Sequence, residues 1–112
     1  MKRLALFLLG AGWLAVASAA TPLETQYAAV RAVGQMNGIA LQCRYLDQVR
    51  RMKSAVVDHA PKERSFGLAF EESTNEAFLA FGRAGERCPG HAGFEAEVGV
   101  RIAAMAAAFA AE

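Results

Sequence analysis

Large apolar residues recur three and four positions apart along most of this chain, and this spacing restricts what the chain can fold into. One row runs from position 23 to position 56, and two more follow between positions 66 and 109. Residues at this spacing share one face of an α-helix, whereas a half-buried strand needs strict alternation. The chain has no useful stretch of such alternation, and β-branched residues are scarce. The pattern therefore predicts an all-α fold, a small bundle of three or four helices.

The first helical segment has a clear start and an ambiguous middle. The stretch Thr21 to Glu24 predicts a helix start, because a threonine cap, a proline at the first helical position and a glutamate at the third form a capping box. Asn37-Gly38 is a turn dipeptide, yet the helical phase resumes beyond it. We expect either two helices or, with slight preference, one long helix kinked at Asn37-Gly38. Pro61 ends the segment.

Two further helices are predicted after Pro61. One spans about Lys62 to Arg83, where glycines at 82 and 85 offer an ending, and the last spans roughly Gly93 to Ala110. Leu23 and Leu41 are also placed on the inner face of the first segment. The large apolar residues on the inner faces supply the predicted core: Tyr27, Val30, Tyr45, Val49, Met52, Phe66, Phe70, Phe81, Phe94, Ile102 and Phe109.

The first twenty residues have the layout of a cleaved signal peptide. A cationic head, Met1-Lys2-Arg3, precedes 14 uncharged residues from Leu4 to Ala17. A membrane-spanning helix needs roughly 20 apolar residues, so this run suits a signal peptide better. Small residues permit cleavage after Ala19 or after Ala20. We therefore expect residues 1–20 to be removed, and residues 21–112 to form a single helical domain that is periplasmic or secreted, without a membrane anchor.

The mature domain retains two cysteines, Cys43 and Cys88. In an oxidising compartment, an even number of cysteines in a small domain favours a disulfide. Neither belongs to a Cys-x-x-Cys motif, so a redox site or covalent haem has no support. We predict a Cys43–Cys88 disulfide, which would stabilise the bundle by about 4 kcal/mol. The alternatives are two free buried thiols, or metal ligation that includes His91 and perhaps His59.

Charge and motifs argue against several classes of function. The chain has 12 basic and 11 acidic residues, and loss of Lys2 and Arg3 changes its formal charge from +1 to −1. A nucleic-acid-binding protein usually has a strongly basic face, so we expect no nucleic-acid partner. The serines of the mature domain lie outside any Gly-x-Ser-x-Gly motif, and no glycine-rich phosphate loop is present. We predict no catalytic residues, no cofactor and no bound metal.

Two groups of charged residues distinguish the predicted surface. The basic group lies on the second helical segment and consists of Arg44, Arg50, Arg51 and Lys53. The acidic group lies on the third segment and consists of Glu71, Glu72 and Glu76. Either group can be an ordinary solvated helix face. Because charged surfaces mainly set partner choice and association rate, we predict that the basic group binds a partner protein.

These features lead us to expect a small, exported, non-enzymatic protein that binds another protein of the cell envelope, as an adaptor, an inhibitor or an immunity-type factor. The layout also resembles that of acid-stress chaperones of the HdeA type. The shared features are a signal peptide, a mature domain of 92 residues, helices throughout and one long-range disulfide. This resemblance implies a small periplasmic chaperone as the alternative function. A small helical enzyme is a third and weaker alternative.

Overall fold

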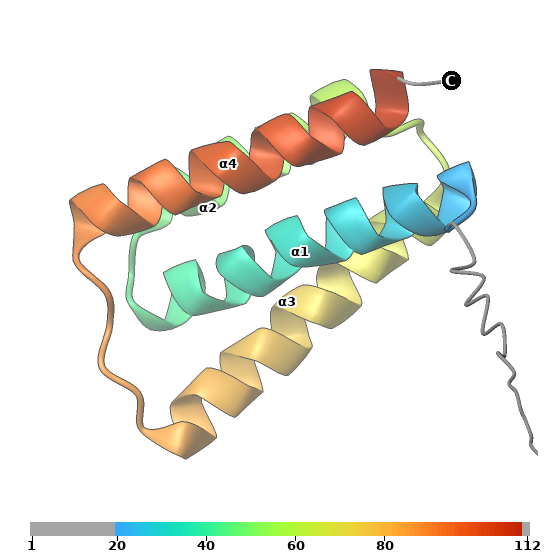
Figure 1. Ribbon diagram of the computed structural model, residues 1–112. Helices are drawn as coiled ribbons and strands as arrows, with labels where there is room; N and C mark the ends of the chain where they lie inside the picture. The colour runs from blue at the N-terminus through green and yellow to red at the C-terminus, as the bar shows by residue number, and fades with distance from the viewer. Residues whose placement is uncertain (1–19, 111–112) are drawn as a thin grey trace, which may run out of the picture.

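The computed structural model describes residues 20–110, and this part of the chain folds into four helices with no strands (Figure 1). The prediction of an all-α bundle is confirmed. The predicted signal peptide, apart from Ala20, lies outside the described residues. None of the described helices is long and apolar enough to cross a membrane. The helices are α1 (Pro22–Gln42), α2 (Leu46–His59), α3 (Arg64–Ala84) and α4 (His91–Ala110).

Helix α1 is the centre of the bundle. Helices α2, α3 and α4 all pack against it, and α2 also packs against α4 (Figure 1). Helix α3 packs extensively on α1 alone. The large apolar residues predicted to form the core are all buried or partly buried. Leu23 and Leu41 are 55 % and 38 % exposed, so their predicted inward positions are wrong. The core around α1 is formed mainly by Val30, Val33, Met36, Ala40, Val49, Met52, Phe66, Phe70, Phe94, Val98 and Met105.

Helix α1 begins with the predicted capping box. The backbone N–H of Glu24 donates to Oγ1 of Thr21 at 3.1 Å, and the backbone N–H of Thr21 donates to Oε1 of Glu24 at 2.9 Å. Pro22 occupies the first helical position, where its missing N–H costs no hydrogen bond. These contacts fix the start of the helix immediately after the predicted cleavage region.

The break in the first helical segment was predicted at the wrong place. Helix α1 continues through Asn37-Gly38 and ends at Gln42. Gly38 belongs to a close contact with α3, because a Cβ there would lie only 2.7 Å from the backbone nitrogen of Phe78. Asn37 is buried, and its Nδ2 donates to Oγ1 of Thr74 on α3 at 3.1 Å. The dipeptide therefore serves helix packing and makes no turn.

The true break between α1 and α2 spans residues 43–45. Its backbone makes the two hydrogen bonds of a Schellman motif: the N–H of Tyr45 donates to the carbonyl of Ala40 at 2.9 Å, and that of Arg44 to the carbonyl of Leu41 at 3.3 Å. Arg44 has a φ of 61°, in the left-handed region that usually belongs to glycine. Because this position holds an arginine, no glycine marks the end of α1 in the sequence.

Candidate interaction surface

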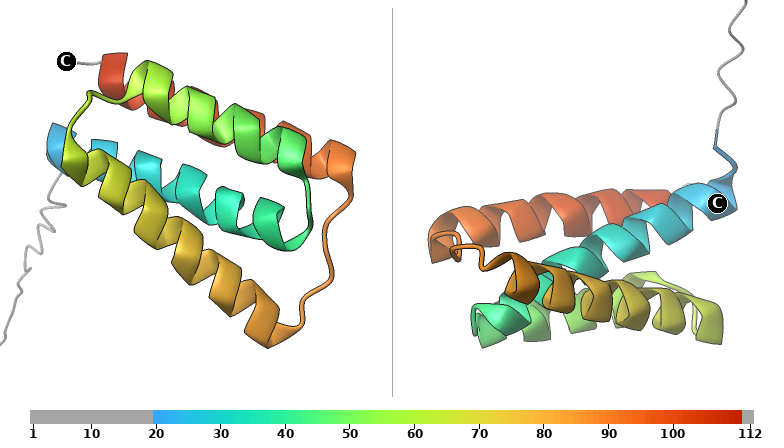
Figure 2. Two further views of the ribbon diagram at one scale, coloured as in Figure 1. Left: turned by 180° about the vertical axis from the view of Figure 1, so that it is seen from behind. Right: turned by 90° about the horizontal axis from the view of Figure 1, so that it is seen from below.

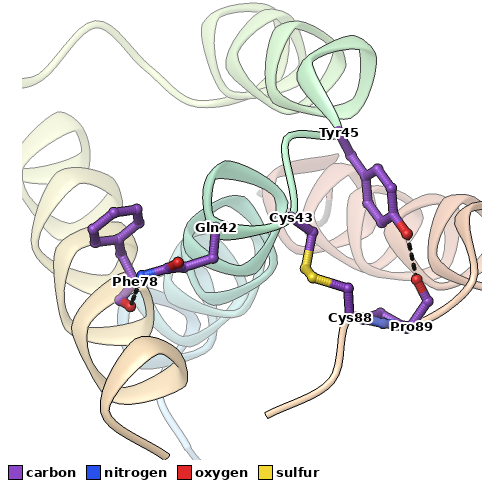
Figure 3. The surroundings of a disulfide bond; sticks show 6 residues. All are labelled: Gln42, Cys43, Tyr45, Phe78, Cys88 and Pro89. Carbon is purple, nitrogen blue, oxygen red and sulfur yellow. Dashed lines mark hydrogen bonds between the residues drawn. A yellow bond between two sulfur atoms is a disulfide. The ribbon is translucent and has the colours of Figure 1, made fainter. Parts of the chain in front are cut away.

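The predicted disulfide is present at the end of α1, where several contacts converge (Figure 3). The Cα atoms of Cys43 and Cys88 lie 5.7 Å apart, and the bond joins α1 to the segment before α4. The Tyr45 hydroxyl donates to the carbonyl of Pro89 in the same segment. On the other side, Nε2 of Gln42 donates to the carbonyl of Phe78 on α3 at 2.9 Å. This end of the bundle is therefore tied to two neighbouring elements.

A hydrogen bond between two side chains links the starts of α2 and α4 beside the disulfide. Nε2 of His91 lies 2.8 Å from Oδ2 of Asp47, and the two side chains are 45 % and 48 % exposed. Nε2 of Gln48 donates to the same carboxylate oxygen at 2.9 Å. These hydrogen bonds, first from Gln48 and then from His91, lower the pKa of Asp47 below its ordinary value of 3.8. The carboxylate therefore helps to position α4 against α2.

Arg51 differs from the other members of the predicted basic group, because its guanidinium bridges two helices. Its Nη1 donates to Oε1 of Gln48 at 3.0 Å and to the backbone carbonyl of Glu95 on α4 at 3.1 Å. Gln48 is itself buried. Arg51 therefore has a structural contact that the sequence pattern did not indicate.

The remaining basic residues, Arg44, Arg50 and Lys53, are exposed. Within the described part of the chain, their side chains make no hydrogen bond or ion pair. Arg50 and Lys53 are three positions apart and thus share one side of α2, while Arg44 lies in the preceding turn. These three cations are free to contact another molecule.

A groove of about 620 Å³ lies between α2 and α3, which diverge from their connection on either side of α1 (left view of Figure 2). We call it the α2–α3 groove. Leu41 and Val57 contribute apolar surface and are 38 % and 64 % exposed. Its lining comes from three helices: Asn37 and Leu41 of α1; Lys53, Val56 and Val57 of α2; and Gly67, Phe70, Glu71, Thr74, Asn75 and Phe78 of α3.

The α2–α3 groove combines opposite charges with a buried amide. Lys53 lies on its α2 side and Glu71 on its α3 side, both exposed. Asn37 is only 2 % exposed, and its Oδ1 accepts no hydrogen bond from any described residue. The sequence pattern treated Asn37 as a turn signal and Glu71 as one of several ordinary surface carboxylates. The groove arises from helix divergence, which spacing along the chain does not encode.

The described residues contain no group of three His, Cys, Asp or Glu side chains that could hold a metal ion. Cys43 and Cys88 are used in the disulfide. His91 instead contacts Asp47 and packs edge-on against the Tyr45 ring, with ring centres 5.0 Å apart. No protein-family model, curated protein or solved structure matches this chain.

Proposed function

We propose that this chain is a small, exported, non-enzymatic binding protein, and that Arg44 and Arg50 contact an acidic surface on another protein of the cell envelope. The conformation of Arg44 carries this proposal. Its left-handed backbone, with φ of 61°, is unfavourable for a residue with a side chain. Glycine would relieve that strain, and strained residues concentrate at functional sites. An exposed arginine in such a position is best explained by a use for its guanidinium.

The surroundings of Arg44 support a binding role. The Cys43–Cys88 disulfide and the hydrogen bond from Tyr45 to Pro89 hold the turn on both sides. A binding surface that is already rigid loses little conformational entropy when a partner docks. Arg50 adds a second unpaired cation in the first turns of α2. Opposite charges across such an interface speed association and select partners.

The proposal is tested with the double substitution Arg44→Glu, Arg50→Glu, in protein purified after periplasmic expression. We expect the wild-type protein to capture a partner from envelope extract at low salt and the variant to lose that capture, because Coulomb attraction becomes repulsion. Arg51 is kept intact, since its loss would disturb the contact between α2 and α4. A control variant, Lys62→Glu with Arg64→Glu, reverses two exposed charges at the opposite end of α2 from Arg44.

Retained capture by the Arg44→Glu, Arg50→Glu variant at low salt, with an unchanged melting temperature, would show that another face binds the partner. The chaperone alternative makes a different prediction for the wild-type protein. It requires loss of compactness and new apolar exposure at about pH 3, measured with a fluorescent hydrophobic dye. An enzyme would instead convert a substrate. Neither the capture experiment nor the dye measurement depends on such an activity.

A further inference from the structure

We propose that the α2–α3 groove is an interface between two copies of this chain, in which α3 of each copy lies against α2 of the other. This goes beyond the proposed function, which concerns Arg44 and Arg50 outside the groove lining. Helix α3 packs extensively on α1 alone, so much of its surface is left without a neighbouring helix. The groove beside it includes the apolar residues Leu41 and Val57, which are 38 % and 64 % exposed. Such exposed apolar area favours association.

The positions of Lys53 and Glu71 indicate which molecule fills the groove. Lys53 lies six residues before the end of α2 at His59, and Glu71 lies seven residues after the start of α3 at Arg64. At 1.5 Å per residue, both stand roughly 10 Å from the connection between the two helices. They are thus at the same level on opposite sides of the α2–α3 groove, and neither has an ion-pair partner within the described residues.

A dimer with a twofold axis along the α2–α3 groove would contain the Lys53–Glu71 pair twice. Rotation about that axis exchanges the two sides of the groove and leaves the level along it unchanged. Lys53 of one copy therefore comes to face Glu71 of the second copy, and Glu71 of the first faces Lys53 of the second. Most homo-oligomers are symmetric dimers in which one patch is complementary to itself, and opposite charges at equal levels meet that requirement.

The net charge of each groove side points to the same occupant. On the α3 side the charged residue of the lining is Glu71, whereas on the α2 side it is Lys53, and both are exposed. A helix that fits against α2 must therefore be acidic and amphipathic. Helix α3 of a second copy has this composition, and Leu41 and Val57 supply apolar surface for it to cover. The chain thus carries both complementary halves of the interface.

The test is the oligomeric state of the purified, disulfide-bonded protein, measured by sedimentation velocity at protein concentrations from about 1 µM to about 500 µM. We expect a dimer that weakens as salt is raised. Lys53→Glu and Glu71→Lys should each raise the dimer dissociation constant by about tenfold or more, because each puts two like-charged pairs in contact. The variant with both substitutions restores both attractions and should dimerise as the wild-type protein does.

Mixing the two single variants gives a sharper result. In that mixture, a copy with Lys53→Glu meets a copy with Glu71→Lys. The introduced glutamate then faces the introduced lysine on one side, and the native Glu71 of the first copy faces the native Lys53 of the second on the other. A heterodimer should therefore form although each variant alone is mainly monomeric. Arg87→Glu and Glu95→Lys make matched charge changes at exposed positions outside the groove lining and should leave dimerisation unchanged.

Three results would overturn the proposal. The first is a wild-type protein that stays monomeric over the whole concentration range. The second is a dimer that the control substitutions weaken as much as Lys53→Glu does. The third is a double variant, or a mixture of single variants, that fails to recover dimerisation. Since Arg44 and Arg50 are intact in these variants, partner capture can fail or succeed independently of the dimer. Circular dichroism confirms that each variant is folded.

Discussion

The helix pairs α1–α3 and α2–α4 are held together by different means. Between α1 and α3, the missing side chains of Gly34 and Gly38 let the helices approach closely, and a Cβ on Gly34 would lie 2.8 Å from the carbonyl oxygen of Phe70. Between α2 and α4, long side chains make the contact. Arg51 reaches the carbonyl of Glu95, and Asp47 pairs with His91.

This difference predicts different responses to substitution. In the α1–α3 pair, an added atom meets backbone, so accommodation requires one helix to move as a whole. In the α2–α4 pair, a long side chain can be replaced while its neighbours adjust or bind water. We therefore expect α1–α3 to be most sensitive to side chains that become larger, and α2–α4 to contacts that are removed.

The largest effect is expected from Gly34→Val. A valine there collides with the side chain of Ser73 and the carbonyl of Phe70, neither of which can withdraw without shifting α3. We expect the free energy of unfolding to fall by about 3 kcal/mol, or the protein to fail to fold. Urea denaturation followed by circular dichroism measures the change. The control is Gly93→Ala, because a Cβ at Gly93 meets nothing within 4 Å.

The control should be neutral or stabilising by up to about 1 kcal/mol, as expected when alanine replaces glycine in an open helical position. A Gly34→Val variant as stable as Gly93→Ala would show that close approach at Gly34 does not limit the α1–α3 pair. A smaller substitution, Gly34→Ala, should fall between them.

The second-largest effect is expected from loss of the Cys43–Cys88 disulfide, which joins the end of α1 to the segment before α4. Cys43→Ser and Cys88→Ser should each lower the free energy of unfolding by about 2–5 kcal/mol, and by similar amounts, because each removes the same loop constraint. Thermal melting with and without reductant makes the measurement. Reduced wild-type protein should melt like either variant. A large effect from only one of the two cysteines would contradict the pairing.

The third effect separates two adjacent arginines. Arg51→Ala removes the hydrogen bonds to Gln48 and to the carbonyl of Glu95, so it should cost about 1–2 kcal/mol. Arg50→Ala removes no hydrogen bond or ion pair among the described residues and should stay within about 0.5 kcal/mol of the wild type. Chemical denaturation of both variants gives the comparison. Similar stabilities for the two would mean that the Arg51 contact contributes little to the α2–α4 pair.

Local patterns in the sequence predicted the helices, their buried faces and the disulfide. The capping box at Thr21 and the spacing from Phe94 to Phe109 depend only on neighbours along the chain, and both are found in the structure. Asn37-Gly38 was misinterpreted because a glycine favours turns and also permits close helix packing. Only the position of α3 decides between these two roles.

The candidate surface was less predictable for the same reason. Arg50 and Arg51 look equivalent in the sequence, yet one guanidinium is free and the other contacts α4, which is distant along the chain. The α2–α3 groove depends on how two helices diverge, and no residue spacing specifies that angle. A useful signal was nevertheless present, since Lys53 and Glu71 are nearly equidistant from the Pro61 turn.

The smallest expected effect concerns Arg44, in the turn that connects the two helix pairs. Helix α3 ends with the same backbone motif: Gly85 has a φ of 63°, and the N–H of Glu86 donates to the carbonyl of Phe81 at 3.4 Å. Two equivalent helix ends thus use glycine in one case and arginine in the other. Glycine adopts this conformation without the steric penalty of a Cβ, so the α1 end should be the strained one.

Arg44→Gly should therefore stabilise the protein by about 0.5–1 kcal/mol, while Gly85→Ala, which has open space around it, should destabilise it by about 1 kcal/mol. Melting temperatures measured under oxidising conditions test both. The decisive measurement adds partner capture: Arg44→Gly should be more stable than the wild type and bind less well, because it removes the strain together with the guanidinium. A variant that gains stability and keeps full capture would show that the strained arginine has no role in binding, and that the functional surface lies elsewhere on the bundle.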